Sequence, residues 1–235
     1  VVNDGGEGVA NPGETLTLDI ELHNFTGIEI GSGTATVSSS DPRVESIAAT
    51  TFNYPAIPAD GAVTINEAVT LTVSGWAPDG CMPAVTVTFE NNLESAIPFE
   101  VYAWELTCET EVAWTDSTVD GRIFPGETGN VAVPVKNHGR IDAASLSANL
   151  YSDDERITVL NNPISFADVG SDSLRNNLLL PFEVQLSEET RIGELIPVFV
   201  QFEDSLGGID SVSTFLIPGD PRIAGATGPD RVAQY

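Results

Sequence analysis

Asn11-Pro12-Gly13-Glu14-Thr15 is a turn that the chain uses twice, because Phe124-Pro125-Gly126-Glu127-Thr128 follows it at an offset of 113 residues. Each turn opens an alternating apolar run, over residues 16–24 in the first case and 131–137 in the second. Apolar residues at every second position are typical of a strand with one buried face. The two turns therefore predict two strands in equivalent places of two similar folds.

The repeat continues beyond these strands. Val85–Phe89 corresponds to Val198–Phe202 at an offset of 113, and Ser39–Asp41 corresponds to Tyr151–Asp153 at 112. Two copies of this length are each large enough to bury a core of their own. We therefore predict one domain over residues 1–108, a second over 109–218, and a linker to a following module over 219–235, where proline and glycine are frequent.

Short alternating segments and turn signals divide both copies, and no stretch has helical periodicity. This pattern predicts an all-β chain of two tandem antiparallel immunoglobulin-like β-sandwich domains. The Cys…Trp…Cys spacing of antibody domains is missing, so the expectation concerns topology only. The expected strands cover residues 15–24, 33–39, 44–54, 64–73, 83–90 and 96–106, then 130–137, 144–151, 157–160, 177–186, 196–203 and 210–217.

The charge of the chain limits its partners. It carries 35 acidic and 9 basic residues, which gives a formal net charge of −26. Such a surface repels phosphate backbones and anionic lipid heads, and no apolar run is long enough to span a bilayer. We expect neither nucleic-acid binding nor membrane insertion. Residue 1 does not begin a signal peptide, so the sequence resembles a mature or excised piece.

Acidic loops make calcium the candidate cofactor. If the strands alternate in direction, the opening segment and two later turns meet at one end of the first domain, where calcium would find several carboxylates. Solubility in a salty habitat would explain the same acidity, and the spacing of an EF-hand is absent. The candidate ligands are Asp4, Glu7, Glu14, Asp41 and Asp79.

The only cysteines, Cys81 and Cys108, are candidates for a disulfide. A hairpin through residues 91–95 would pair residues whose numbers sum to about 189, which places the two cysteines opposite one another. A bridge would stabilise the domain by about 3 to 4 kcal/mol and would indicate an oxidising compartment. Two buried thiols remain the alternative, since the second copy has no cysteine of its own.

Catalytic motifs are missing from the sequence. The only histidines, His23 and His138, lie at strand ends in different copies, and no zinc helix, nucleophile elbow or phosphate-binding loop is present. We therefore expect that the chain is not an enzyme.

The turn at Asn11–Thr15, the strand ending in Asn24, Ser38–Pro42 and Ala77–Gly80 together resemble the immunoglobulin-like accessory modules of secreted bacterial proteins. Such modules occur beside the catalytic domains of gingipain-like and other extracellular peptidases and in cell-surface proteins. The second copy departs from the pattern at Asp153-Asp154-Glu155, and the closing Gly228-Pro229-Asp230 is similar to the start of a further module. The resemblance implies a noncatalytic role in a secreted or cell-surface protein.

Three functions follow from these observations. The first is a structural spacer or interaction platform whose partners are neighbouring domains of the same polypeptide or other surface proteins. The second is a carbohydrate-binding module that stacks glycans on Trp76, Tyr54 and Tyr151. The third is a self-assembling surface or filament subunit joined through strand edges or a donated segment such as residues 1–9.

Overall fold

The computed structural model describes residues 2–3, 8–108, 113–116 and 122–219, and these residues form strands and no helices. No helix in these ranges is therefore long and apolar enough to cross a membrane. Contacts divide the chain into two compact units. Unit 1 comprises Val1–Ala103 with Leu206–Gly208, and unit 2 comprises Trp104–Ser205 with Ile209–Tyr235. The division lies between Ala103 and Trp104, which is earlier than residue 108.

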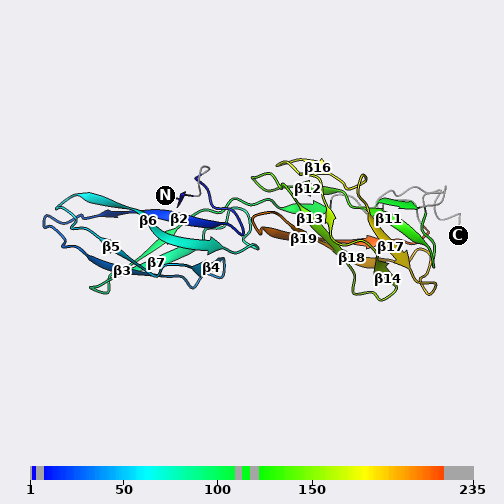
Figure 1. Ribbon diagram of the computed structural model, residues 1–235, viewed down its shortest axis with the longest axis horizontal. Helices are drawn as coiled ribbons and strands as arrows, with labels where there is room; N and C mark the ends of the chain where they lie inside the picture. Colours follow the sequence, from blue (N-terminus) through cyan, green and yellow to red (C-terminus); the bar gives the residue numbers. More distant parts are fainter. Residues whose placement is uncertain (1, 4–7, 109–112, 117–121, 220–235) are drawn as a thin grey trace. The chain divides into compact units, whose positions relative to one another are not determined.

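Unit 1 is a sandwich of two antiparallel four-stranded sheets (Figure 1). The strand orders are β1-β2-β6-β4 and β5-β3-β7-β8. Its strands are β1 (Val2–Asn3), β2 (Thr15–His23), β3 (Gly33–Ser38), β4 (Val44–Ile47), β5 (Thr51–Tyr54), β6 (Ala62–Val73), β7 (Ala84–Phe89) and β8 (Glu94–Pro98).

Unit 2 repeats this architecture with the sheets β10-β11-β17-β14 and β15-β13-β18-β19, and it adds a three-stranded sheet β16-β12-β9. Pro134 separates β11 from β12, because proline has no backbone N–H to donate to a strand partner. The corresponding residues of unit 1 form one continuous strand, β2. The strands are β9 (Leu106–Cys108), β10 (Ala113–Asp116), β11 (Thr128–Ala132), β12 (Val135–Asn137), β13 (Ser147–Tyr151), β14 (Ile157–Val159), β15 (Ile164–Ser165), β16 (Leu174–Arg175), β17 (Phe182–Leu186), β18 (Ile196–Glu203) and β19 (Ile209–Leu216).

The two units share one topology. β3, β4, β5, β7 and β8 of unit 1 correspond in pairing and order to β13, β14, β15, β18 and β19 of unit 2. The buried apolar side chains form two separate clusters, one in each unit. The prediction of two tandem antiparallel immunoglobulin-like sandwiches is confirmed.

The repeated Pro-Gly-Glu turn has the same geometry in both units. Gly13 and Gly126 have φ angles of 76° and 84°, a left-handed conformation that only glycine adopts without strain. The Oε2 of Glu14 accepts the N–H of Asn11 at 3.0 Å, and the Oε2 of Glu127 closes the second turn at 2.9 Å. Each glutamate is therefore part of its turn, which explains why the whole motif occurs twice.

The structure has no disulfide between Cys81 and Cys108, and the strand register explains why the predicted pairing was wrong. The β7–β8 hairpin pairs Ala84 with Pro98, and the carbonyl of Cys81 accepts the N–H of Val101 at 3.0 Å. The numbers of paired residues therefore sum to 182 and not to about 189, so Val101 and not Cys108 lies opposite Cys81. Cys108 lies in β9, which pairs with β12 of unit 2.

Candidate functional site

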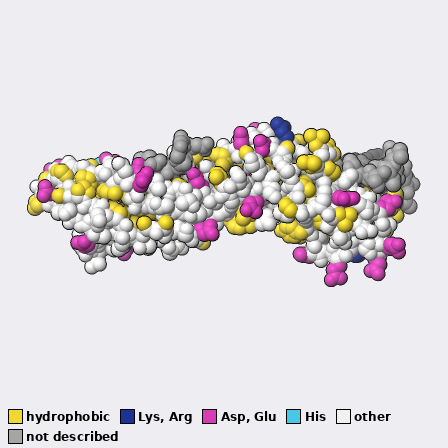
Figure 2. Space-filling view, in the orientation of Figure 1, with side chains coloured by type: hydrophobic (Ala, Val, Ile, Leu, Met, Phe, Trp, Pro, Cys, Tyr) yellow, Lys and Arg dark blue, Asp and Glu magenta, His cyan; other side chains and the backbone are white. Residues whose placement is uncertain are grey.

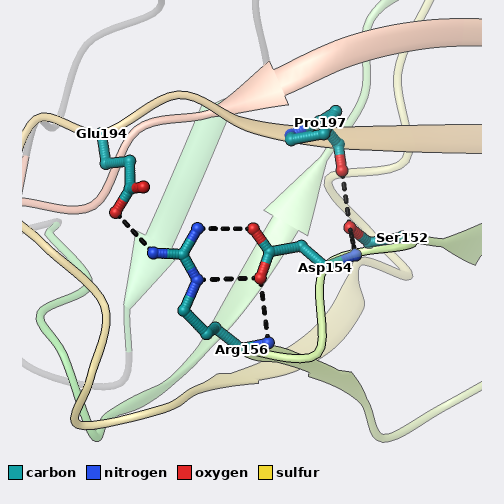
Figure 3. Close-up of polar contacts among 5 residues, drawn as sticks. All are labelled: Ser152, Asp154, Arg156, Glu194 and Pro197. Atoms are coloured by element: carbon teal, nitrogen blue, oxygen red, sulfur yellow. Dashed lines mark hydrogen bonds and ion pairs between the residues drawn. The ribbon is translucent and has the colours of Figure 1, made fainter.

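A cluster of ionised and polar side chains lies at the corner between β13 and β14 in unit 2 (Figure 3). The Nε and Nη2 of Arg156 donate to the two carboxylate oxygens of Asp154 at 2.9 and 2.6 Å, and its Nη1 donates to Glu194 at 2.7 Å. The Oγ of Ser152 donates to the carbonyl of Pro197 at 2.6 Å and accepts the N–H of Asp154 at 3.1 Å. We call this arrangement the Asp-Arg corner.

Electrostatics keep the Asp-Arg corner fully charged. The hydrogen bonds from the Arg156 side chain and backbone lower the pKa of Asp154 to about 2. The same guanidinium lowers the pKa of Glu194, and the two carboxylates raise the pKa of Arg156. None of these groups titrates near neutral pH, so the cluster is suited to holding a loop and not to moving a proton.

Unit 1 contains the same corner with one substitution. The Nε and Nη2 of Arg43 donate to Asp41 at 2.8 and 2.6 Å, and Ser39 donates to the carbonyl of Ala84 at 2.7 Å. These residues match unit 2 at an offset of 113, which corrects the offset of 112 assigned to Ser39–Asp41. Cys81 stands where unit 2 has Glu194, and burial raises the pKa of its thiol although Arg43 lies beside it.

The described calcium candidates serve other purposes. Glu14 closes its turn, Asp41 binds Arg43, and the Oδ1 of Asp79 accepts the N–H of Ala103 at 2.9 Å. Asp4 and Glu7 lie outside the described residues. Across the described ranges no group of three or more His, Cys, Asp or Glu side chains is placed to hold a metal ion. Acidic side chains are spread over the visible face of each unit (Figure 2).

The aromatic and histidine candidates are distributed over both units. Tyr54 is 9% exposed and packs edge-to-face on Phe89, so it offers no stacking face for a glycan. Trp76 and Tyr151 are exposed but belong to different units. His23 and His138 also lie in different units, and the Nε2 of His23 is 3.3 Å from the carboxylate of Glu21.

An apolar cavity at the edge of unit 1 was missed by the sequence analysis. Its volume is about 350 Å³, and it lies between the end of β2 and the β7–β8 turn. Phe25 is 87% exposed at its mouth and Leu93 is 61% exposed. The signal was present in the sequence, because Phe25, Ile28 and Ile30 stand in a loop where polar residues are usual. The apolar lining comprises Leu22, Phe25, Ile30, Tyr54, Ile57, Phe89 and Leu93.

Comparisons with known proteins assign no family to the chain. No family model and no curated protein matches it. Among solved structures it is similar to an intimin fragment in complex with the intimin-binding domain of the translocated intimin receptor, with a TM-score of 0.29 and 11% identity. The match covers 89% of this chain and 61% of the fragment. The Pseudomonas aeruginosa CupB2 chaperone gives a TM-score of 0.21 at 13% identity, over 88% of this chain and 96% of the chaperone.

Proposed function

We propose that the chain is a noncatalytic pair of immunoglobulin-like modules of a larger secreted or cell-surface protein, in which it acts as a spacer and an interaction platform. The observation that carries the proposal is the duplication of polar clusters that bind the protein's own backbone. The Asp–Arg pair of the Asp-Arg corner and the Pro-Gly-Glu turn recur with the same backbone hydrogen bonds in both units. Features kept in both copies hold loops in place, as a scaffold requires.

Charge and surface chemistry support the choice of partners. A net charge of −26 disfavours nucleic acids and anionic membranes, whereas exposed apolar side chains beside the unit 1 cavity suit a protein partner. Neighbouring domains of the same polypeptide and other surface proteins are therefore the proposed partners. We retain calcium as a proposed stiffening ion of unit 1 because of the acidic composition alone. Its binding would compete with the hydrogen bonds that Glu14, Asp41 and Asp79 already make.

A domain replacement in the parent protein tests the proposed function. Residues 8–219 would be replaced by two unrelated β-sandwich domains of the same length, and in a second variant they would be deleted. A spacer predicts that the replacement keeps the activity and surface display of the flanking region, whereas the deletion impairs them. An unchanged deletion variant would reject the spacer role. Loss of activity in both the replacement and the deletion would show that the units supply a specific contact.

A further inference from the structure

The outer face of one sheet in unit 2 carries three aromatic side chains on the neighbouring strands β13, β18 and β19 (Figure 1). Tyr151 in β13 lies directly opposite Phe199 in β18. Phe215 in β19 lies opposite Pro197, two residues before Phe199. The residue that precedes each ring in its strand is buried, so the three rings share the face that points away from the core. We call these three residues the aromatic row.

The aromatic row is accessible to a ligand. Tyr151 and Phe215 are 44% and 48% exposed, and Phe199 is half-buried. The rings of Tyr151 and Phe199 are stacked, with centroids 5.3 Å apart and planes inclined by 20°. Each of these two rings uses only one of its faces in the pair. Exposed apolar side chains that are gathered on one face, unlike scattered ones, are typical of a binding surface.

The architecture that the two units share does not require these rings. In unit 1 the corresponding strands are β3, β7 and β8, and the positions of the three rings are taken by Ser38, Thr86 and Pro98. Ser38 lies opposite Thr86 in the same register as the ring pair of unit 2. A sandwich of this topology therefore forms without aromatic side chains on this face, so folding alone does not account for them.

A row of uncharged polar side chains borders the aromatic row. Asn149 lies opposite Gln201, and Gln201 lies opposite Ser211, each two residues along its strand from the row of Tyr151 and Phe199. Amides and hydroxyls both donate and accept hydrogen bonds. The chain has 35 acidic residues, yet the two rows together contain none. Rings beside neutral polar groups suit an uncharged ligand that is rich in hydroxyls.

We propose that this face of unit 2 binds a neutral carbohydrate, whose pyranose rings stack on the aromatic row and whose hydroxyls hydrogen-bond Asn149 and Gln201. Sugars with equatorial hydroxyls fit best, because their ring faces present only C–H groups to the negative face of an aromatic ring. A sugar hydroxyl both donates and accepts, as the amides do, whereas a proline-rich peptide offers only carbonyl acceptors. The net charge of −26 disfavours acidic polysaccharides and a second copy of this chain. The ligand goes beyond the proposed spacer role and does not depend on it.

Calorimetric titration of the full chain with defined sugars tests the proposal. The probes are cellohexaose and the hexamer of N-acetylglucosamine, both with equatorial hydroxyls, and hexagalacturonate is the anionic control. At least one neutral hexamer is expected to bind with a Kd of about 1 mM or tighter. The anionic control is expected to bind at least about tenfold more weakly. No binding of either neutral hexamer, or equal binding of the anionic one, would overturn the proposal.

Unit 1 supplies the residues for the variant that locates the site. Tyr151→Ser with Phe199→Thr installs the pair that unit 1 carries as Ser38 and Thr86, so the sheet is expected to fold. Binding of the neutral hexamer is expected to weaken at least about tenfold. Trp76→Thr removes an exposed ring of unit 1 and is expected to change binding less than about twofold. Equal weakening by Trp76→Thr would place the site elsewhere and reject the proposal.

The polar row gives a second test that keeps both rings. Gln201→Ala removes one amide from the proposed site, and Gln185→Ala removes an exposed amide from β17 in the other sheet of unit 2. Only Gln201→Ala is expected to weaken binding, by about fivefold, with Tm unchanged in both variants. Unchanged binding in the ring variant and in Gln201→Ala would reject the site.

Sedimentation of the chain without sugar tests the alternative occupant. The proposal expects a monomer, and a dimer that the ring variant dissociates would assign the face to a second copy and so contradict the carbohydrate proposal. The outcome is independent of the domain replacement in the parent protein. A spacer whose face binds nothing would pass the replacement test and fail the titration, whereas a carbohydrate-binding pair without a spacer role would do the reverse.

Discussion

Asn24 and Asn137 hold the same loop in two separate sandwiches. The Nδ2 of Asn24 donates to the carbonyl of Ile28 at 2.8 Å, and the Nδ2 of Asn137 donates to the carbonyl of Ile141 at the same distance. The Oδ1 of each side chain accepts a backbone N–H two residues later at 2.9 Å. Both asparagines are buried, with 2% and 0% exposure, so each amide replaces the backbone partner that a turning strand loses.

The first prediction concerns Asn137. Its Oδ1 also accepts the N–H of Glu105 at 3.1 Å, and its Nδ2 donates to the carbonyl of Val169 at 3.0 Å. Asn137→Ala leaves several buried backbone groups without partners, so the free energy of unfolding is expected to fall by about 3 kcal/mol. Denaturant unfolding of unit 2 measures the loss. The half-buried Asn149→Ala is the control, and a similar loss in both variants would contradict the structural role of Asn137.

The second prediction concerns the residue that differs between the two Asp-Arg corners. Glu194 binds Arg156 in unit 2, and Cys81 takes its place beside Arg43 in unit 1. Cys81→Glu is expected to add the missing ion pair and to raise the Tm of unit 1 by no more than a few degrees, because partly exposed pairs contribute little. Cys81→Gln is the matched control. Equal shifts in both variants would show that charge is not the cause.

The third prediction is that protonation of Asp154 contributes to the loss of stability at acidic pH. Its pKa is lowered to about 2 in the folded chain, against about 3.9 for an unfolded aspartate. The stabilisation is therefore present above about pH 4 and is lost as the pH falls toward 2. Asp154→Asn is expected to flatten the decline of Tm over this range, whereas the exposed neighbour Asp153→Asn leaves it unchanged. A decline of the same steepness in Asp154→Asn would reject the assignment.

In the same experiment, Asp210 is expected to affect the pH dependence of stability in the direction opposite to Asp154. Burial raises its pKa, although it accepts the N–H groups of Leu106 and Ser211. A folded-state pKa above the unfolded value means that the native chain binds more protons, so this contribution is lost as the pH rises through the raised pKa. Comparing the Tm–pH profiles of Asp210→Asn and Asp154→Asn separates the two effects. Asp210→Asn removes a loss of stability above about pH 4, and Asp154→Asn removes a loss of stability below it.

Strand positions could be predicted because side-chain alternation is local. β2 and β18 match the expected residues 15–24 and 196–203 closely, since their buried face repeats every second residue. The expected strand over 96–106 was wrong, because β8 ends at Pro98 and Leu106 belongs to a strand of unit 2. Alternation does not reveal which neighbour a strand pairs with, and the mistaken cysteine pairing had the same cause.

The polar site depends on partners that residue type does not specify. Asp41 has the chemistry of a calcium ligand, yet Arg43, two residues later, binds both of its carboxylate oxygens. The acidic composition therefore correctly predicted an acidic surface, but it could not predict where a binding site lies.

The fourth prediction is a count of thiols. Without reductant the chain is expected to react with two equivalents of a thiol reagent after denaturation, because both Cys81 and Cys108 are free thiols in the structure. In the native chain, alkylation of Cys81 should be slow at pH 7 and accelerate as the pH rises, since burial raises its pKa. Mass spectrometry of the alkylated peptides gives both results. A mass two protons light would restore the disulfide.

The fifth prediction is the calcium dependence of unit 1. Calcium bound at a site formed with Asp4 and Glu7 would raise the Tm of unit 1 by mass action. At a calcium concentration 100 times Kd, the free energy of unfolding would increase by about 2.7 kcal/mol. Calorimetry in millimolar calcium and in chelator measures the shift, and Asp4→Asn with Glu7→Gln is expected to abolish it. The matched control, Asp153→Asn with Glu155→Gln, removes the same charge from unit 2. Identical melting curves in calcium and chelator would remove calcium from the proposed function and leave the spacer role intact, because the hydrogen bonds that close the repeated turns involve no metal.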